Sequence, residues 1–238
     1  PAAIGSFCFR ADGGLLLALQ TGLHRTDKPG GTLTPFVQPE PDKPGNRLND
    51  GRVDPAGRYW VGSMSDESRE PLGSLYRIDP DGRCSHHGNQ IVVPNSIAWA
   101  PDGRTMYFAD TYRDTIWQYD YDVATGAQGN RRLFRDTRGH PGRPDGSAMD
   151  AAGCLWNCEY NGGRVVRYRP DGEIDRVLEL PVTNPTCCCF GGSDFRTLFI
   201  TTARQRLTAQ ELAAQPLAGS VFAVKLNVSG LPEHRFAG

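Results

Sequence analysis

Short apolar runs, each bounded by a polar turn, follow one another along the whole chain. In five places a turn and a glycine or arginine come before an aromatic-rich or aliphatic run that reads as a β-strand. These five copies are marked by Gly13, Gly57, Gly103, Gly153 and Arg196. Successive copies lie 44, 46, 50 and 43 residues apart. Self-similarity at such a period indicates a repeat architecture.

A second strand pattern follows within each repeat and ends in another turn, as in L-Y-R-I-D-P-D-G (75–82) and V-V-R-Y-R-P-D-G (165–172). Proline presets φ in such turns and glycine accepts a positive φ. Two hairpins per period give about four strands per repeat, which is typical of β-propeller blades. The pattern therefore predicts an all-β propeller in a single domain, residues 1–238, with five repeats visible.

One segment departs from the strand pattern. Residues 204–218 form an insertion in the last repeat, in which T-A-Q-E (208–211) has the pattern of a helical capping box and Pro216 marks the end. Such a box satisfies the free N–H groups of a first helical turn. We expect one short surface helix here.

The charge balance limits the possible partners. The chain has 26 Lys and Arg against 27 Asp and Glu, a net charge of −1. Nucleic acids and anionic membranes require a basic excess, so neither is expected, and a small molecule is the predicted partner. The longest apolar run, Leu15–Leu19, is too short to span a bilayer.

The cysteines indicate a reducing environment. There are 7 of them, an odd number, and three are consecutive at 187–189. Neighbouring residues of a strand point to opposite faces, so this run suits small packed side chains better than a disulfide framework. We expect free thiols and a cytoplasmic location.

Three polar residues share one phase of the repeat. Asn49, Asn95 and Asp145 each precede their repeat glycine by 8 residues. Residues at one phase of a propeller lie on one rim or line the channel, so these side chains should converge. The alternative is that N-D-G and P-D-G are turns only, as elsewhere in the chain; the shared phase of three copies favours a site.

Oxygen ligands at this phase indicate a hard cation. Asn and Asp oxygens suit Ca²⁺, Mg²⁺ or Mn²⁺, and Zn²⁺ and Fe²⁺ also accept carboxylates. The nearby Arg47 offers a planar donor fork for carbonyl or carboxylate oxygens. Other chemistries lack their motifs: the sequence has no G-x-S-x-G, H-E-x-x-H, Walker loop or G-x-G-x-x-G, and its five histidines lack ligand-like spacing.

Several longer motifs support a family resemblance. They are R-L-N-D-G-R-V-D-P-A-G-R-Y-W-V-G (47–62), P-N-S-I-A-W (94–99), P-D-G-S-A-M-D (144–150), Y-N-G-G-R-V-V-R (160–167) and C-C-F-G-G (188–192). In combination they resemble the SMP-30/gluconolactonase/regucalcin family over essentially the whole chain. The resemblance implies a six-bladed propeller that binds one divalent cation in its channel and hydrolyses aldonolactones, such as glucono-, arabinono- or xylonolactone.

The resemblance also implies roles for individual residues. By motif position, Asn95 and Asp145 match metal ligands, and Asp145 also matches the proposed base. Arg47 and Asn49 match a substrate-contacting pair, and Glu67 matches a further substrate-contacting acid. The sequence departs from the family in one respect: it lacks the motif G-E-x-P, which carries another metal ligand at the start of the first blade. Two interpretations are open: either that blade lies outside this sequence, or the site is incomplete and its activity is compromised.

The sequence thus predicts metal-assisted hydrolysis of a sugar lactone, with Ca²⁺, Zn²⁺, Mg²⁺, Mn²⁺ or Fe²⁺ as the cofactor. Two other classes of function remain open. One is a calcium-binding regulatory protein without turnover, and the other is a non-catalytic propeller scaffold for protein partners.

Overall fold

The computed structural model describes residues 3–238, which form five antiparallel sheets. The first three sheets are β1 (Ile4–Phe9), β2 (Leu15–Leu19), β3 (Gly22–Thr26) and β4 (Thr34–Val37); β5 (Asn46–Val53), β6 (Tyr59–Ser65), β7 (Gly73–Ile78) and β8 (Cys84–Ile91); and β9 (Pro94–Trp99), β10 (Thr105–Asp110), β11 (Thr115–Asp122) and β12 (Ala127–Asp136). The other two are β13 (Arg143–Met149), β14 (Leu155–Tyr160), β15 (Arg164–Tyr168) and β16 (Ile174–Glu179), and the three-stranded β17 (Pro185–Gly191), β18 (Thr197–Thr202) and β19 (Val221–Lys225).

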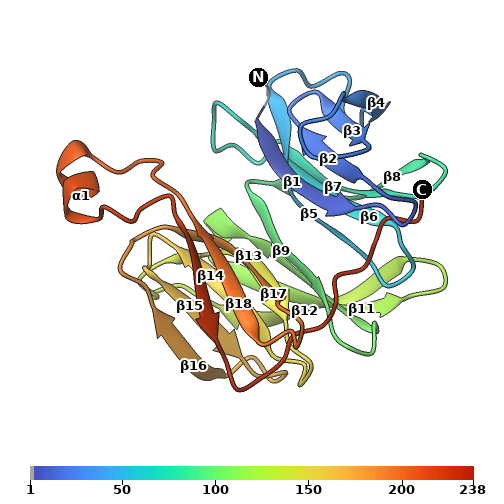
Figure 1. Cartoon of the computed structure of the whole chain (residues 1–238). Coiled ribbons are helices and arrows are strands. Elements are labelled where there is room, and N and C mark those ends of the chain that lie inside the picture. The colour runs from blue at the N-terminus through green and yellow to red at the C-terminus, as the bar shows by residue number, and fades with distance from the viewer. Residues whose placement is uncertain (1–2) are drawn as a thin grey trace.

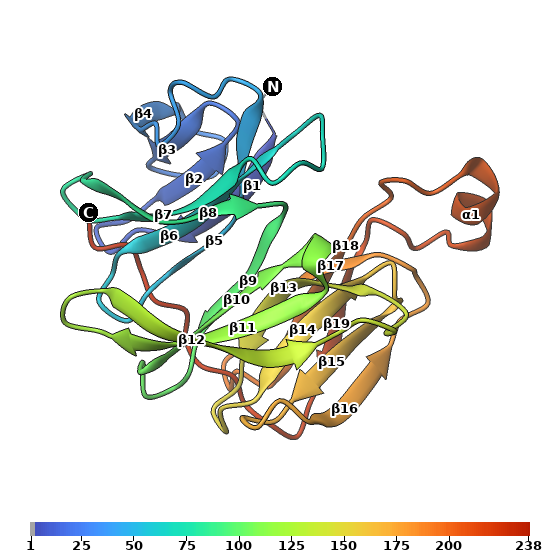
Figure 2. The same cartoon turned by 180° about the vertical axis from the view of Figure 1, so that it is seen from behind.

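Each sheet is one blade, with its strands paired in chain order (Figures 1 and 2). The first strands of successive blades pack side by side: β1 on β5, β5 on β9, β9 on β13 and β13 on β17. The predicted all-β propeller is therefore confirmed. The six-bladed form is not what residues 3–238 build: each of the five sequence repeats supplies one blade, and the described residues form five sheets.

The acidic residue of the repeat turn has a structural function in two blades. One oxygen of Asp54 accepts hydrogen bonds from the backbone N–H groups two and four residues later, at 2.8 and 3.0 Å, and the other accepts from Trp60 Nε1 at 3.2 Å. Asp150 repeats this with Trp156 Nε1 at 2.9 Å. Both carboxylates are fully buried. The motif D-x-x-G-x-x-W thus ties the turn to the strand that follows it.

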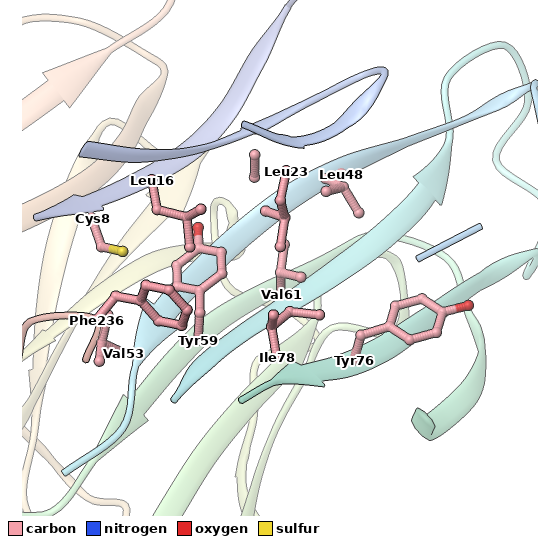
Figure 3. Packing of buried hydrophobic residues seen from close by; sticks show 11 residues of the cluster. Cys8, Leu16, Leu23, Leu48, Val53, Tyr59, Val61, Tyr76, Ile78 and Phe236 are labelled. Atoms are coloured by element: carbon pink, nitrogen blue, oxygen red, sulfur yellow. The ribbon is translucent and has the colours of Figure 1, made fainter. Parts of the chain in front are cut away.

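The core lies between the blades. Figure 3 shows one cluster, in which Leu16 of β2, Tyr59 of β6 and Ile78 of β7 pack together and are fully buried. Phe236 of the C-terminal segment joins them; its backbone pairs with Phe9 through a 2.9 Å hydrogen bond. The end of the chain therefore packs against the first two blades.

Two helical elements lie outside the sheets. The 3-10 helix η1 (Thr111–Arg113) follows β10 directly. The helix α1 (Ala209–Ala214) lies inside the expected segment 204–218 and projects from the blades in Figure 1. Its N-terminus is closed by a capping box between Thr208 and Glu211. Within residues 3–238 no helix has the length and apolar character needed to cross a membrane.

All seven cysteines lie within residues 3–238, and none of them forms a disulfide there. Cys188 is buried, whereas Cys187 is half-buried and Cys189 is exposed. Cys187 packs directly behind Gly146, where an added Cβ would lie 2.5 Å from its sulfur. The run therefore supports the backbone next to Asp145.

Candidate active site

The three polar residues of shared phase lie on the first strands of three successive blades. Asn49 lies in β5, Asn95 in β9 and Asp145 in β13. The pairing register of each strand shifts by one residue at this point. Such bulges bend a strand and redirect its side chains. Next to Asn95, the buried Ser96 has a φ of 60°, a conformation that non-glycine residues rarely adopt.

A chain of hydrogen bonds joins the three strands. Arg47 Nη1 donates to Asn49 Oδ1 at 2.8 Å, and Asn49 Nδ2 donates to Asn95 Oδ1 at 3.2 Å. Asn95 Nδ2 donates to Thr111 Oγ1 at 2.7 Å, and this hydroxyl donates to the Pro144 carbonyl at 2.8 Å. Pro144 directly precedes Asp145 in the chain. The structure thus brings together residues that are nearly 100 positions apart in the sequence.

The carboxylate of Asp145 is half-buried and, within residues 3–238, makes no ion pair. Burial raises the pKa of Asp145 well above its usual value, and the negative charge of Asp50 raises it further. Asn157 holds the bulge in place, because its Nδ2 donates to the Asp145 carbonyl oxygen and to Ser147 Oγ, each at 3.0 Å. The site therefore contains a fixed carboxylate without a countercharge.

These side chains line one cavity of about 610 Å³, to which Arg47, Asn49, Asn95 and Asp145 all contribute. Glu67 does not line it. Glu67 is exposed and borders a neighbouring hollow with Lys43, whereas Asp66, one residue earlier, binds Arg47 Nε at 2.7 Å.

One residue that lines the cavity, Asn184, does not share the phase of the other three and was not predicted from the repeat. Asn184 is 1% exposed, and its Oδ1 has no hydrogen-bond partner among the described residues, although its Nδ2 donates to the Gln205 carbonyl at 3.0 Å. A buried acceptor without a partner is uncommon and indicates a ligand or an ordered water. In the third and fourth repeats a proline precedes the polar residue, but in the fifth the order is reversed, N-P (184–185), so a fixed phase does not find it.

The donors in the cavity suit one hard divalent cation. Asn95 Oδ1 and the Asp145 carboxylate are the oxygen types such cations prefer. A bound cation would also stabilise the ionised form of this half-buried carboxylate, which no arginine or lysine among residues 3–238 neutralises. Residues 3–238 hold no cluster of three or more His, Cys, Asp or Glu side chains suited to a metal.

A β-propeller whose first strands direct polar side chains into one cavity is a protein built to bind a small molecule. Comparison with known families identifies it further. The family model described as SMP-30/Gluconolactonase/LRE-like region matches residues 1–204. The chain belongs to this family.

Related proteins match along the full chain. A 6-deoxy-6-sulfogluconolactonase of Pseudomonas putida is 40% identical over 239 residues, covering 100% of this chain and 82% of the relative. Regucalcin of Gallus gallus is 36% identical over 244 residues, with the same coverage of 100% and 82%. A solved structure of a calcium-binding regucalcin from Agrobacterium tumefaciens has a TM-score of 0.95 and 35% identity, covering 100% of this chain and 81% of that one.

Proposed function

We propose that this protein hydrolyses an aldonolactone with the help of one divalent cation. The observation that carries the proposal is the unpaired, half-buried carboxylate of Asp145, which shares a cavity with the bonded series Arg47, Asn49 and Asn95. The family relationship and the relative named as a 6-deoxy-6-sulfogluconolactonase identify the chain as a lactonase.

The side chains of the cavity have separate tasks in this mechanism. Arg47 and Asn49 hold and orient the ring oxygens of the substrate, and Asn49 does so by redirecting an amide hydrogen that binds the Pro94 carbonyl at 2.9 Å in this structure. Asp145 accepts a proton from the water that attacks the lactone carbonyl carbon. The ring C–O bond then breaks, its oxygen takes up the proton that Asp145 removed from the water, and an open-chain hydroxy acid is released. Burial raises the pKa of Asp145 in the metal-free protein, and a cation bound to the carboxylate would lower it again, so both effects set its strength as a proton acceptor.

A cation fits this arrangement at Asn95 and Asp145. When bound, a divalent cation would supply Lewis-acid stabilisation of the negative charge that develops on the carbonyl oxygen. Glu67 is not part of this proposal as a direct contact, because it borders the neighbouring hollow.

The test is acid release from δ-gluconolactone, followed with a pH indicator and corrected for spontaneous hydrolysis. We expect turnover that a chelator abolishes and that Ca²⁺, Mg²⁺, Mn²⁺ or Zn²⁺ restores. Turnover that persists undiminished after exhaustive chelation would contradict the role of the metal. The absence of turnover with glucono-, arabinono- and xylonolactone in the presence of each cation would contradict the lactonase proposal.

A second candidate is calcium binding without turnover. It is favoured by the structural relative from Agrobacterium tumefaciens, whose description is that of a calcium-binding protein. Calorimetric titration with Ca²⁺ beside the turnover assay separates the two, since only this second candidate gives binding without acid release.

Replacing Asn184 by alanine is expected to raise KM for the lactone by roughly twofold to tenfold and to lower thermal stability only modestly, since the buried hydrogen bond from Nδ2 to the Gln205 carbonyl is also lost. The free Oδ1 is available to a substrate hydroxyl, and one hydrogen bond contributes about 0.5–1.5 kcal/mol. Steady-state kinetics and a thermal melt measure both effects. The matched control is Asn89→Ala, at an exposed position outside the cavity. An unchanged KM together with a strongly lowered Tm would show that Asn184 is structural.

A further inference from the structure

Three arginines from separate parts of the chain surround one tyrosine at the edge of the cavity. Arg206 Nη1 donates to Tyr112 Oη at 2.7 Å. The guanidinium carbons of Arg143 and Arg69 lie 4.6 and 5.3 Å from the centre of the Tyr112 ring. All four residues line the same cavity as Asp145.

The positive charge of this group is only partly neutralised. Arg143 pairs with Asp114 at 3.2 Å, whereas within residues 3–238 neither Arg69 nor Arg206 forms an ion pair. Arg69 Nη1 is also buried without a hydrogen-bond partner. The other lining acid near this end, Glu211, is engaged in the helix cap. Two of the three guanidinium groups are therefore available to an anion.

The titration behaviour of Tyr112 agrees with an excess of positive charge. Burial opposes ionisation of its hydroxyl, yet the hydrogen bond from Arg206 and the charge of Arg69 lower the pKa of Tyr112 below its ordinary value.

The arginine group adjoins the reacting end of the cavity. Arg143 precedes Asp145 by two residues in β13, so their Cα atoms are separated by about 7 Å at the usual rise of a strand. Tyr112 follows Thr111, whose hydroxyl contacts Asn95. A sugar chain whose lactone carbonyl lies at Asp145 can therefore extend toward the arginines.

We propose that Arg69, Arg143 and Arg206 form a subsite for an anionic group, a sulfonate, phosphate or carboxylate, at the end of the substrate opposite the lactone carbonyl. Guanidinium groups present paired N–H donors that match the oxygens of such groups. This inference rests on the proposed lactonase function and names the class of lactone that the site selects.

The experiment compares δ-gluconolactone with counterparts that carry a terminal sulfonate, phosphate or carboxylate. We expect kcat/KM to be roughly tenfold to hundredfold higher for at least one anionic lactone, through a lower KM, because the anionic group gains charge-assisted hydrogen bonds that the neutral lactone lacks. The preference should weaken as ionic strength rises. The variants Arg69→Gln and Arg206→Gln should each remove most of the preference and leave kinetics with the neutral lactone unchanged.

Arg132→Gln is the matched control, because it removes the same charge from an exposed arginine that pairs with Asp120 outside the cavity. Equal kcat/KM for neutral and anionic lactones would overturn the inference while leaving the lactonase proposal intact. If no lactone is hydrolysed, the subsite is tested by calorimetric titration, in which the affinity for phosphogluconate is compared with that for gluconate. If no lactone is hydrolysed but phosphogluconate binds tighter in an Arg206-dependent manner, the subsite stands and the proposed reaction fails; equal binding would overturn the subsite.

Discussion

Asp145→Asn is expected to lower kcat for aldonolactone hydrolysis by about 10²–10⁴-fold, the usual contribution of a positioned proton acceptor. Asparagine keeps the size of the side chain but accepts no proton from water and carries no negative charge for a cation. Steady-state kinetics and calorimetric titration with the activating cation measure the two losses. We expect metal affinity to fall together with kcat.

The same variant has a second, independent signature in the metal-free protein. The folded-state pKa of Asp145 is raised, so the folded protein favours the protonated form, and ionisation destabilises it as pH rises above the unfolded value of about 4. Asp145→Asn removes this effect and should raise the Tm of the metal-free protein at neutral pH, with the difference disappearing toward acid pH. Asp171→Asn, at an exposed turn, is the control. A variant that keeps more than a tenth of the wild-type kcat would exclude Asp145 as the base.

Asp54→Ala is expected to reduce the free energy of unfolding by about 3–5 kcal/mol, as for other buried charge networks broken at one partner. Asp54 is fully buried and binds Arg58 Nε at 2.6 Å, in addition to two backbone N–H groups and the indole of Trp60. It also accepts the hydroxyl hydrogen of Tyr121, from the neighbouring blade. Its loss leaves the buried guanidinium of Arg58 without a carboxylate and removes the hydrogen bond that joins two neighbouring blades. Urea denaturation, with the m-value as a check on two-state behaviour, measures the change.

Asp102→Ala provides the comparison for this prediction. Asp102 occupies the corresponding turn of the third repeat, but it is exposed, and its side chain accepts one hydrogen bond, from the backbone of Arg104 at 2.9 Å. We expect it to change the free energy of unfolding by less than about 1 kcal/mol. Equal effects of the two substitutions would show that the acidic turn residue acts through the turn alone and not through the buried network.

The sequence determined the blades and the polar residues that their first strands direct into the cavity, for one physical reason. In a propeller each repeat folds into the same unit, so equal phase in the sequence becomes an equal position in space. Asn49, Asn95 and Asp145 share that phase, and the structure places them on adjacent first strands, with Asn49 bonded to Asn95. The turn signals similarly marked the hairpins, and the capping box marked α1.

Only the tertiary structure decided the features that do not repeat. Motif position matches Glu67 to a substrate-contacting acid, whereas in the structure Asp66 binds Arg47 and Glu67 borders the neighbouring hollow. Asn184 enters the cavity from a repeat whose phase is altered.

The arginine group depends on tertiary structure most completely. Arg69, Arg143 and Arg206 come from a loop, the start of a strand and the segment before α1, and they share no phase, spacing or motif. Their approach to Tyr112 results from the packing of blades that are distant in sequence, and a periodic pattern contains no information about such contacts. The repeat thus fixes what each blade presents to the channel, whereas the segments between strands, which differ from blade to blade, decide which substrate the cavity can accept.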